Sequence, residues 1–219
     1  MPQPLILVPT EPERTLIEPE FEAAWGGRAR VELCGFGPVV AAARTARLLA
    51  EHRPPRVLLV GIAGRLADRL AIGAAYAFDR VAGHGVGAGS GDAFTPAESL
   101  GWPQWPGDAL DSATRIGDVL PCESGGPAAA PRAGLLLSAC AASACEADVI
   151  ARLRLFPSAT AEDMEGFAVA AACRLAGIPL DIVRGISNTA GDRDHSRWQI
   201  DAACRAAASL AAAILGGRS

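Results

Sequence analysis

The stretch that decides the fold is ATAEDMEGFAVAAACRLAGIPLDIVRGI, residues 159–186. Residues 159–163 and 180–186 are short runs that predict strands. Between them, residues 164–175 form an apolar segment of helical length, and the glycine and proline that follow are a typical end signal of a helix. A strand, a helix and a strand in alternation indicate an α/β fold with a largely parallel sheet.

The same alternation continues on both sides of this stretch. The sequence predicts strands at 5–8, 31–35, 56–60, 74–81 and 134–138, and helices at 13–25, 38–52, 143–156 and 198–215. We expect Pro19 to interrupt the first helix and residues 61–64 (GIAG) to form a tight turn after a strand. Ser143 with Glu146 three residues later has the spacing of a capping box and predicts a helix start.

Residues 84–131 differ from the rest of the chain because they are rich in Gly, Pro, Ser and Asp and show no clear period. A loop of this length is rare in a compact domain unless it is functional or contains short elements. We expect it to cover a substrate or to form an interface, for which the Trp-containing and Pro-rich residues 101–106 are the candidate. The whole chain, 1–219, is predicted to be one domain.

Composition excludes several classes of function. The net charge is −4, which argues against nucleic acid as a partner. All 20 basic residues are Arg, and the absence of Lys excludes a Schiff-base lysine, a pyridoxal-phosphate enzyme and a P-loop lysine. The three His are far apart in sequence, so we expect no metal site, and no cofactor is implied.

Six cysteines lie mostly in Ala-rich apolar stretches and form no Cys-x-x-Cys pair. We expect reduced thiols in a reducing compartment. The N-terminal residues lack the basic and apolar regions of a signal peptide. The longest Ala-rich run, 202–215, is too short to cross a bilayer. The sequence therefore predicts a cytoplasmic protein without a membrane partner.

Polar residues follow four of the predicted strands, and ligands of α/β sheets bind beyond the carboxyl ends of strands. These groups are residues 10–13, 61–64, 162–166 and 187–194. Because Glu165 lies where an apolar helix begins, a buried carboxylate there needs partners, and a functional role is favoured over a capping role.

Other readings stay open for the remaining groups. Glu13 also fits a solvated first helical turn that the helix dipole favours. Asn188 also fits a turn or a helix cap. For Arg193 and its neighbours up to Arg197, a surface cluster of salt bridges is the favoured interpretation.

Several motifs together resemble one known family. Residues 162–170 (EDMEGFAVA) resemble the Met-Glu motif of the purine nucleoside phosphorylase and nucleosidase superfamily, and residues 35–38 (GFGP) and 61–64 match its two glycine motifs in order. Residues 184–194 (RGISNTAGDRD), Trp198 and, in the middle segment, residues 91–94 (GDAF) are similar to its futalosine hydrolase branch. The resemblance implies a single three-layer domain with a central, mostly parallel mixed sheet that forms homo-oligomers.

The implied reaction is hydrolysis of the N-ribosidic bond of a nucleoside, which for futalosine releases hypoxanthine. By resemblance, Glu13 activates the attacking water, Glu165 holds the ribose hydroxyls and Met164 packs against the sugar. Asn188 carries both a donor and an acceptor and is assigned to a 6-oxopurine base. The predicted binding set is completed by Ala63, Gly64, Ser187, Phe94 and Arg193. Futalosine carries an aryl carboxylate on its extended ribose, for which Arg193, Arg197 and the residues of the 84–131 segment are the candidates.

Alternative functions also fit parts of the sequence. A methylthioadenosine or S-adenosylhomocysteine nucleosidase would have Asp in place of Asn188. A phosphorylase needs cations for phosphate, for which Arg14 and Arg44 are available, although Glu11 and Glu13 disfavour an anion there. A nucleoside sensor without catalysis would lack the water-activating carboxylate. An esterase is disfavoured because no Gly-x-Ser-x-Gly elbow is present.

Overall fold

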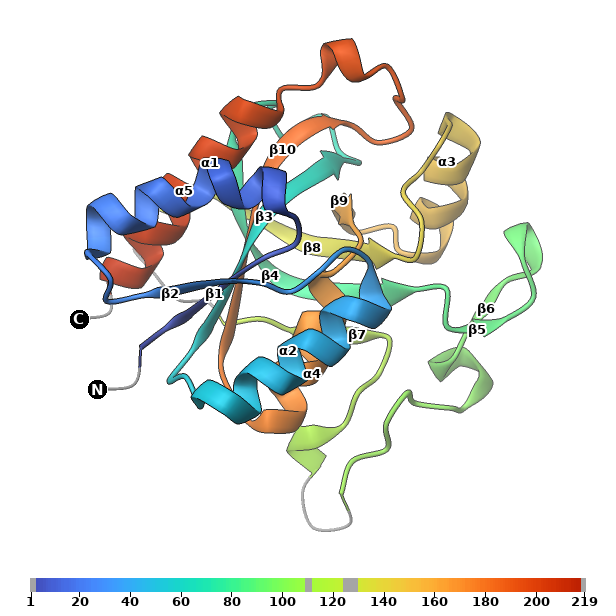
Figure 1. The fold of residues 1–219 in the computed structure, drawn as a ribbon. Helices are drawn as coiled ribbons and strands as arrows, with labels where there is room; N and C mark the ends of the chain where they lie inside the picture. The colour runs from blue at the N-terminus through green and yellow to red at the C-terminus, as the bar shows by residue number, and fades with distance from the viewer. Residues whose placement is uncertain (1–2, 109–111, 124–129, 218–219) are drawn as a thin grey trace.

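The computed structural model describes residues 3–108, 112–123 and 130–217 (Figure 1). The strands are β1 (Leu5–Val8), β2 (Arg30–Leu33), β3 (Val57–Arg65), β4 (Ala75–His84), β5 (Gly87–Ala88), β6 (Thr95–Pro96), β7 (Val119–Pro121), β8 (Arg132–Ala139), β9 (Ala159–Asp163) and β10 (Leu180–Thr189). The α-helices are α1 (Glu11–Trp25), α2 (Pro38–His52), α3 (Glu146–Leu155), α4 (Gly166–Ala176) and α5 (Ile200–Gly216). Every strand and helix predicted from the sequence is present, and β3, β4 and β10 extend beyond their predicted ends.

The main sheet is mixed and mostly parallel, as the sequence predicts. Parallel pairs join β1 to β2 and β3, β3 to β10, β8 to β4 and β9. Antiparallel pairs join β4 to β10 and β7, and β3 to β9. Five strands close on themselves in the order β3, β10, β4, β8, β9 and back to β3. The closing pairs are Gly64 with Glu162 and Arg65 with Ala161, so the ends of β3 and β9 lie side by side.

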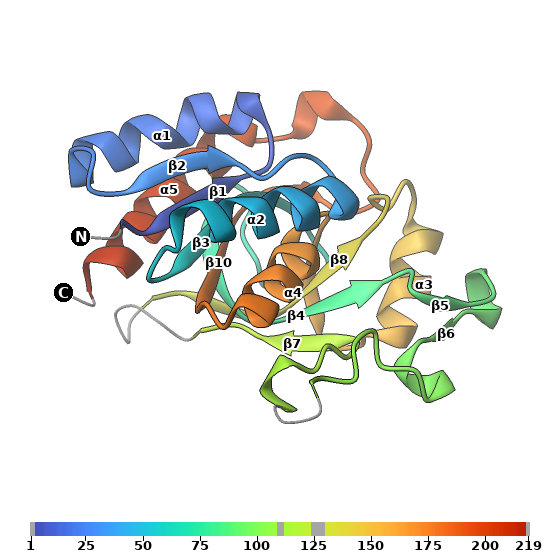
Figure 2. The same cartoon turned by 60° about the horizontal axis from the view of Figure 1, so that its bottom comes forward.

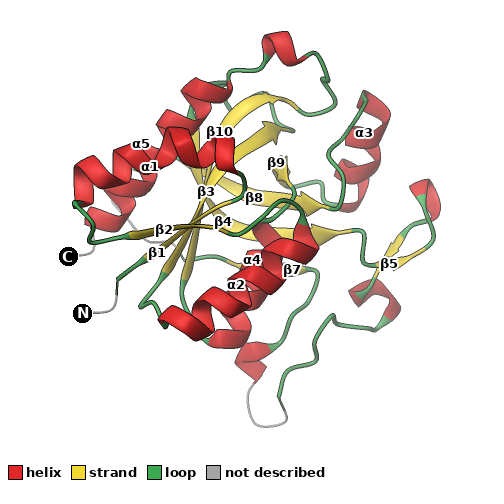
Figure 3. Cartoon of the chain, in the orientation of Figure 1, coloured by secondary structure: helices red, strands yellow, loops and turns green. Residues whose placement is uncertain are grey.

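Helices cover the sheet in two layers (Figure 3). Helices α1 and α5 pack together on one face, where Ile17, Phe21 and the small residues of α5 bury Val60 and Val183. Helices α2 and α4 pack together on the other face over Leu59, Val81 and Ile186. The α5 face is built from alanines and a cysteine at helical spacing, which lets this helix approach the sheet closely: Ala203, Cys204, Ala207, Ala208 and Ala211.

The prediction of a turn at residues 61–64 is wrong, because these residues continue β3 and pair with β10 from Arg184 to Asn188. Neither Gly61 nor Gly64 has a positive φ. A Cβ at Gly61 would overlap the Arg184 guanidinium and lie 2.7 Å from Glu13 Oε1. This glycine is therefore required for close approach of side chains rather than for a turn.

Two predicted helix signals are also wrong. Pro19 does not interrupt α1, because it lies on the exposed side of the helix while Ile17 and Phe21 anchor the helix in the core. Ser143 does not cap α3, which begins at Glu146. The backbone N–H and hydroxyl of Ser143 instead donate to the buried Glu162, at 2.8 and 2.7 Å.

The long segment 84–131 contains short elements, which is one of the two expectations stated for it. Strands β5 and β6 form a small hairpin beside α3, and β7 extends the main sheet at β4 (Figure 2). Glu98 and Asp118 bind each other. The Glu98 carboxylate accepts the backbone N–H of Asp118 at 2.6 Å, and the Asp118 carboxylate accepts the backbone N–H of Glu98 at 3.0 Å. Such contacts order a segment that has no hydrophobic period.

The cysteines and the helices bear on two expectations from the sequence, reduced thiols and the lack of a membrane span. All six cysteines are free thiols, and Cys34, Cys173 and Cys204 are buried. Across the described residues, none of the helices combines the length and the apolar character that crossing a membrane requires.

We predict that Gly185→Ala destabilises the fold, because a Cβ on β10 would overlap the carbonyl oxygen of Ala203 in α5. Overpacking of this kind costs about 1–3 kcal/mol of unfolding free energy. Gly216→Ala, near the end of α5, is the matched control because its Cβ would lie 3.7 Å from Trp25. Urea denaturation measures both variants, and equal midpoints would contradict the prediction.

Candidate active site

A cavity of about 350 Å³ opens where β1, β3, β9 and β10 end. Its walls also include the start of α1, the loop between β8 and α3, and the loop between β10 and α5. The lining is largely apolar with a few convergent polar groups, as is typical of small-molecule sites. The polar and charged lining residues are Thr10, Glu13, Ser143, Glu162, Asp163, Glu165, Ser187, Asn188, Arg193 and His195.

Glu13 is buried in the first turn of α1 and is held from both sides. Its Oε2 accepts the Thr10 hydroxyl at 2.6 Å, and its Oε1 accepts the backbone N–H of Ile62 at 3.0 Å. Thr10 is also the N-cap residue of α1. The carboxylate is therefore fixed in the cavity wall rather than solvated on the helix surface.

Glu165 immediately precedes α4 and is buried opposite the start of α2. Its Oε1 accepts the backbone N–H of Gly37 at 2.9 Å, and its Oε2 lies 3.6 Å from Nη2 of Arg184. Burial, together with the negative charge of Asp163, raises the pKa of Glu165 to about 7 against the attraction of Arg184. Its charge therefore changes near neutral pH.

Arg184 is a fully buried cation on β10. Its Nε and Nη2 donate to Oδ2 of Asp163 at 3.0 and 2.5 Å, whereas Nη1 is buried without a hydrogen-bond partner in the described structure. Burial lowers the pKa of Arg184, but the charges of Asp163, Glu165 and Glu13 outweigh this effect and the pKa is raised. The guanidinium thus compensates the carboxylates that converge on the cavity.

Ser187 and Asn188 end the buried part of β10 beside β3. The Ser187 hydroxyl donates to Oδ1 of Asn188 at 2.8 Å and lies 3.3 Å from the carbonyl of Ala63. The Asn188 amide donates to the Thr189 carbonyl at 2.9 Å. These bonds fix the amide orientation and leave the second N–H of Asn188 as a donor for a ligand.

A second buried ion pair supports the opposite wall. Arg152 of α3 donates to Oε2 of Glu162, to the Ser143 hydroxyl at 2.8 Å and to the Ala141 carbonyl at 2.6 Å. These bonds hold the loop between β8 and α3 against the end of β9. The backbone of this loop is thereby positioned beside the cavity.

Comparison with known proteins identifies the family of the chain. The family model described as "Phosphorylase superfamily" matches residues 7–216. The chain belongs to the phosphorylase superfamily.

Named relatives of the chain include two futalosine hydrolases and a nucleosidase. The chain is 30% identical to futalosine hydrolase of Streptomyces coelicolor, over 78% of the chain and 72% of the relative. It is 34% identical to futalosine hydrolase of Acidothermus cellulolyticus, over 81% and 71%. It is 29% identical to 5'-methylthioadenosine/S-adenosylhomocysteine nucleosidase of Chromohalobacter salexigens, over 75% and 68%.

Solved structures share the fold of this superfamily member. The nucleosidase of Neisseria meningitidis gives a TM-score of 0.76 at 21% identity, over 98% of the chain and 99% of that structure. The nucleosidase of Streptococcus pneumoniae gives 0.77 at 19%, over 99% and 100%. At these identities the likeness shows the fold alone.

Most of the site residues that were predicted from the superfamily resemblance line this same cavity: Glu13, Ala63, Gly64, Met164, Glu165, Ser187, Asn188 and Arg193. Phe94 does not line it. Its ring instead packs edge-on against His84, with 5.1 Å between ring centroids. Glu11 is exposed and pairs with Arg14.

Other cavity features of the superfamily member were not assigned from the sequence. Phe36 contributes apolar wall, and Arg184, which pairs with Asp163 of the lining, contributes buried charge. The signal for Arg184 is visible in the sequence, because one Arg inside the apolar run 180–186 must find carboxylate partners when that strand is buried. No comparable signal marks Phe36, whose side chain is 65% exposed.

We predict that Glu165→Gln removes a pH-dependent loss of stability. The folded-state pKa, about 7, exceeds the ordinary value of 4.5, so between these values the folded protein holds more protons than the unfolded chain. The unfolding free energy of the wild type should therefore fall relative to the variant as pH rises from about 5 to 7. Denaturation at each pH measures this difference.

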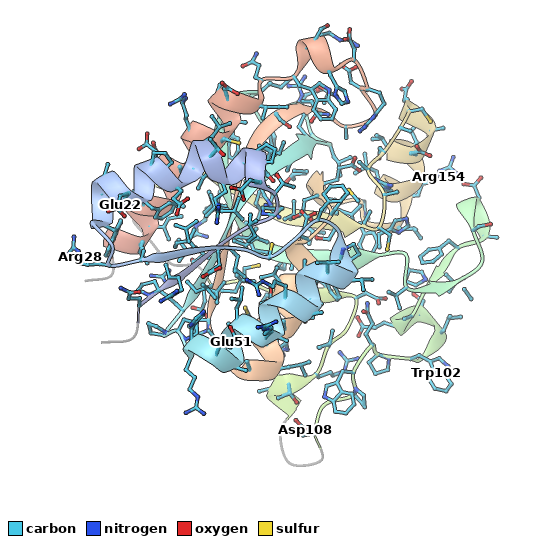
Figure 4. The ribbon with its side chains drawn as sticks, in the orientation of Figure 1. Glu22, Arg28, Glu51, Trp102, Asp108 and Arg154 are labelled. Carbon is cyan, nitrogen blue, oxygen red and sulfur yellow. The ribbon has the colours of Figure 1, made fainter. Side chains whose placement is uncertain are left out.

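The control is Glu22→Gln on the exposed face of α1 (Figure 4). Its stability difference from the wild type should stay level over the same pH range. A level difference for Glu165→Gln as well would contradict the prediction.

Proposed function

We propose that the protein hydrolyses the N-ribosidic bond of futalosine and releases hypoxanthine. The observation that carries the proposal is the pair of buried carboxylates, Glu13 and Glu165, in one cavity of a phosphorylase-superfamily fold. The futalosine hydrolases at 30% and 34% identity support the choice of substrate.

Glu13 is proposed to act as the general base. Water attacks the anomeric carbon, its proton passes to Glu13, and the bond to the purine nitrogen breaks with its electron pair on the base, which takes up a proton from solvent to give hypoxanthine. The bonds from Thr10 and Ile62 hold the carboxylate in one position throughout. A positioned general base contributes about 10²–10⁴-fold to the rate.

Glu165 is proposed to bind the ribose hydroxyls in its ionised form. The sugar gains positive charge as the bond to the base breaks, and a carboxylate beside it stabilises that charge. Arg184 keeps this carboxylate from being an isolated buried charge. Met164, next to Glu165 in the lining, is assigned to the sugar face.

The charges of the cavity favour water over phosphate. Glu13, Glu162, Asp163 and Glu165 all line it. The two arginines that could bind phosphate in a phosphorylase form ion pairs with other residues. Arg14 pairs with Glu11 and Glu18, and Arg44 pairs with Glu32. An inorganic anion that approached Glu13 would therefore meet like charge.

Asn188 favours a 6-oxopurine as the leaving base. Its remaining N–H can donate to O6 or N7, while its Oδ1 is already engaged by Ser187. The competing assignment is a methylthioadenosine or S-adenosylhomocysteine nucleosidase, which the relatives at 29% identity favour. A sensor without catalysis is disfavoured because both carboxylates are held in place.

The protein is proposed to work in the cytoplasm as a homo-oligomer. Six free thiols suit a reducing compartment. Trp102 projects from the long segment and is 74% exposed, and Leu100 beside it is 44% exposed (Figure 4). Large exposed apolar side chains of this kind suit an interface. Gel filtration showing only a monomer would remove this part of the proposal.

Base release tests the proposed reaction. The protein is incubated with futalosine, inosine and methylthioadenosine, each with and without phosphate, and the free base is separated by chromatography. Hypoxanthine from futalosine, independent of phosphate, is the expected result. Adenine from methylthioadenosine alone would overturn the substrate assignment, and dependence on phosphate would overturn hydrolysis.

We predict that Glu13→Gln lowers kcat for futalosine about 10²–10⁴-fold, because the amide cannot accept the proton of water. The matched control is Glu11→Gln, two residues earlier on the same helix and exposed to solvent. It should retain kcat within about twofold. Initial rates of hypoxanthine release measure both variants, and equal kcat values would exclude Glu13 as the base.

We predict that Asn188→Asp shifts the preference from a 6-oxopurine towards a 6-aminopurine. An ionised carboxylate cannot donate to O6, and a protonated one can donate to N7. The ratio of kcat/KM for futalosine to that for methylthioadenosine should fall at least about tenfold, one lost hydrogen bond being worth about that factor. An unchanged ratio would remove Asn188 from base selection.

A further inference from the structure

The loop between β10 and α5, residues 190–199, places an aromatic and cationic cluster in the cavity wall. Arg193, His195 and Trp198 all line the cavity. The Arg193 guanidinium lies 5.2 Å from the centroid of the Trp198 ring, and the His195 ring stacks on Trp198 at 4.3 Å between centroids. The catalytic assignment uses none of these three side chains.

The loop is tied down at both ends. The backbone N–H of Asp192 donates to the Thr189 carbonyl at 3.1 Å, and that of Gln199 donates to the Ser187 carbonyl at 2.8 Å. The Trp198 indole N–H donates to the Asp192 carbonyl at 3.2 Å. The cluster is therefore built into the same strand end that carries Asn188.

The two arginines of the loop differ in their charge balance. Arg197 binds Asp192 at 2.6 Å and Asp194 at 3.3 Å, so its charge is neutralised on the surface. Arg193 has no carboxylate within 4.0 Å among the described residues, although it is flanked by both aspartates in sequence. It is the cation that this loop leaves available to a ligand.

The carboxylates of the cavity are not the ligand of Arg193, because each of them already has its own partners. Glu162 pairs with Arg152, Asp163 and Glu165 with Arg184, and Glu13 accepts two hydrogen bonds. An unneutralised guanidinium beside a stacked aromatic pair is suited to an anionic group carried on an aromatic ring.

We infer that Arg193, with Trp198 and His195, forms the subsite for an aryl carboxylate of the substrate. This rests on the proposed function, since futalosine carries an aryl carboxylate on its extended ribose. Arg193 binds the carboxylate, and the Trp198–His195 pair contacts the aromatic ring. The subsite selects the substrate while the carboxylates deeper in the cavity carry out hydrolysis.

Paired substrates test the inference. Futalosine and its carboxylate methyl ester are compared on the wild type, Arg193→Gln, Arg193→Lys and the control Arg47→Gln, which changes an exposed arginine of α2 that pairs with Glu51. Arg193→Gln should lower kcat/KM for futalosine about 10- to 100-fold, mainly through KM, because one charge-assisted contact is lost. Ester hydrolysis should change less than about threefold, Arg193→Lys should recover part of the loss, and Arg47→Gln should match the wild type.

Equal losses for acid and ester, or no loss in Arg193→Gln, would overturn the subsite while leaving the proposed reaction intact. If the wild type releases no base from futalosine, the proposed reaction fails and the subsite is tested by binding alone. Benzoate and benzamide are then titrated by NMR into the wild type and Arg193→Gln. Binding of benzoate that exceeds benzamide and is lost in the variant supports the subsite, and equal binding overturns it.

Discussion

The buried guanidinium of Arg184 is the contact on which the site depends. A cation with no exposure to solvent needs opposite charge close by, and here Asp163 at the end of β9 and Glu165 before α4 supply it. One side chain thus links β10 to β9 and to the start of α4. Gly61 makes room for it on β3, since any side chain there would overlap the guanidinium. Replacing Arg184 would leave Asp163 and Glu165 as uncompensated charge.

The closed order of strands explains why these groups meet at all. In an open sheet, β3 and β9 would lie apart, whereas here two residue pairs at Gly64 and Arg65 bring their ends together. The parallel pairing of β3 with β10 then sets Asn188 opposite Gly64. The polar residues that follow these strands in sequence therefore face one cavity, which is why reasoning from strand ends located most of the site.

The correct predictions from the sequence mostly concern local structure. Apolar runs and helix end signals placed the strands and helices because neighbours in sequence determine them. The failures have non-local causes. Two glycines separated by two residues fit a turn as well as a close approach, and only the position of Arg184 on another strand decides between them. Ser143 had the spacing of a helix cap, but Glu162, 19 residues later, competes for its hydrogen bonds.

The division of charge in the cavity also limits where substrate selection can reside. A free cation placed near Glu13 or Glu165 would pair with them and reduce their ability to accept protons or hydroxyl groups. A cation that recognises an anionic substituent must therefore lie on a different element. The carboxylates near it on that element must be paired with another cation. The loop after β10 meets both conditions, because Arg197 engages Asp192 and Asp194 and leaves Arg193 on the wall. Recognition can then change through this loop without altering the buried carboxylates.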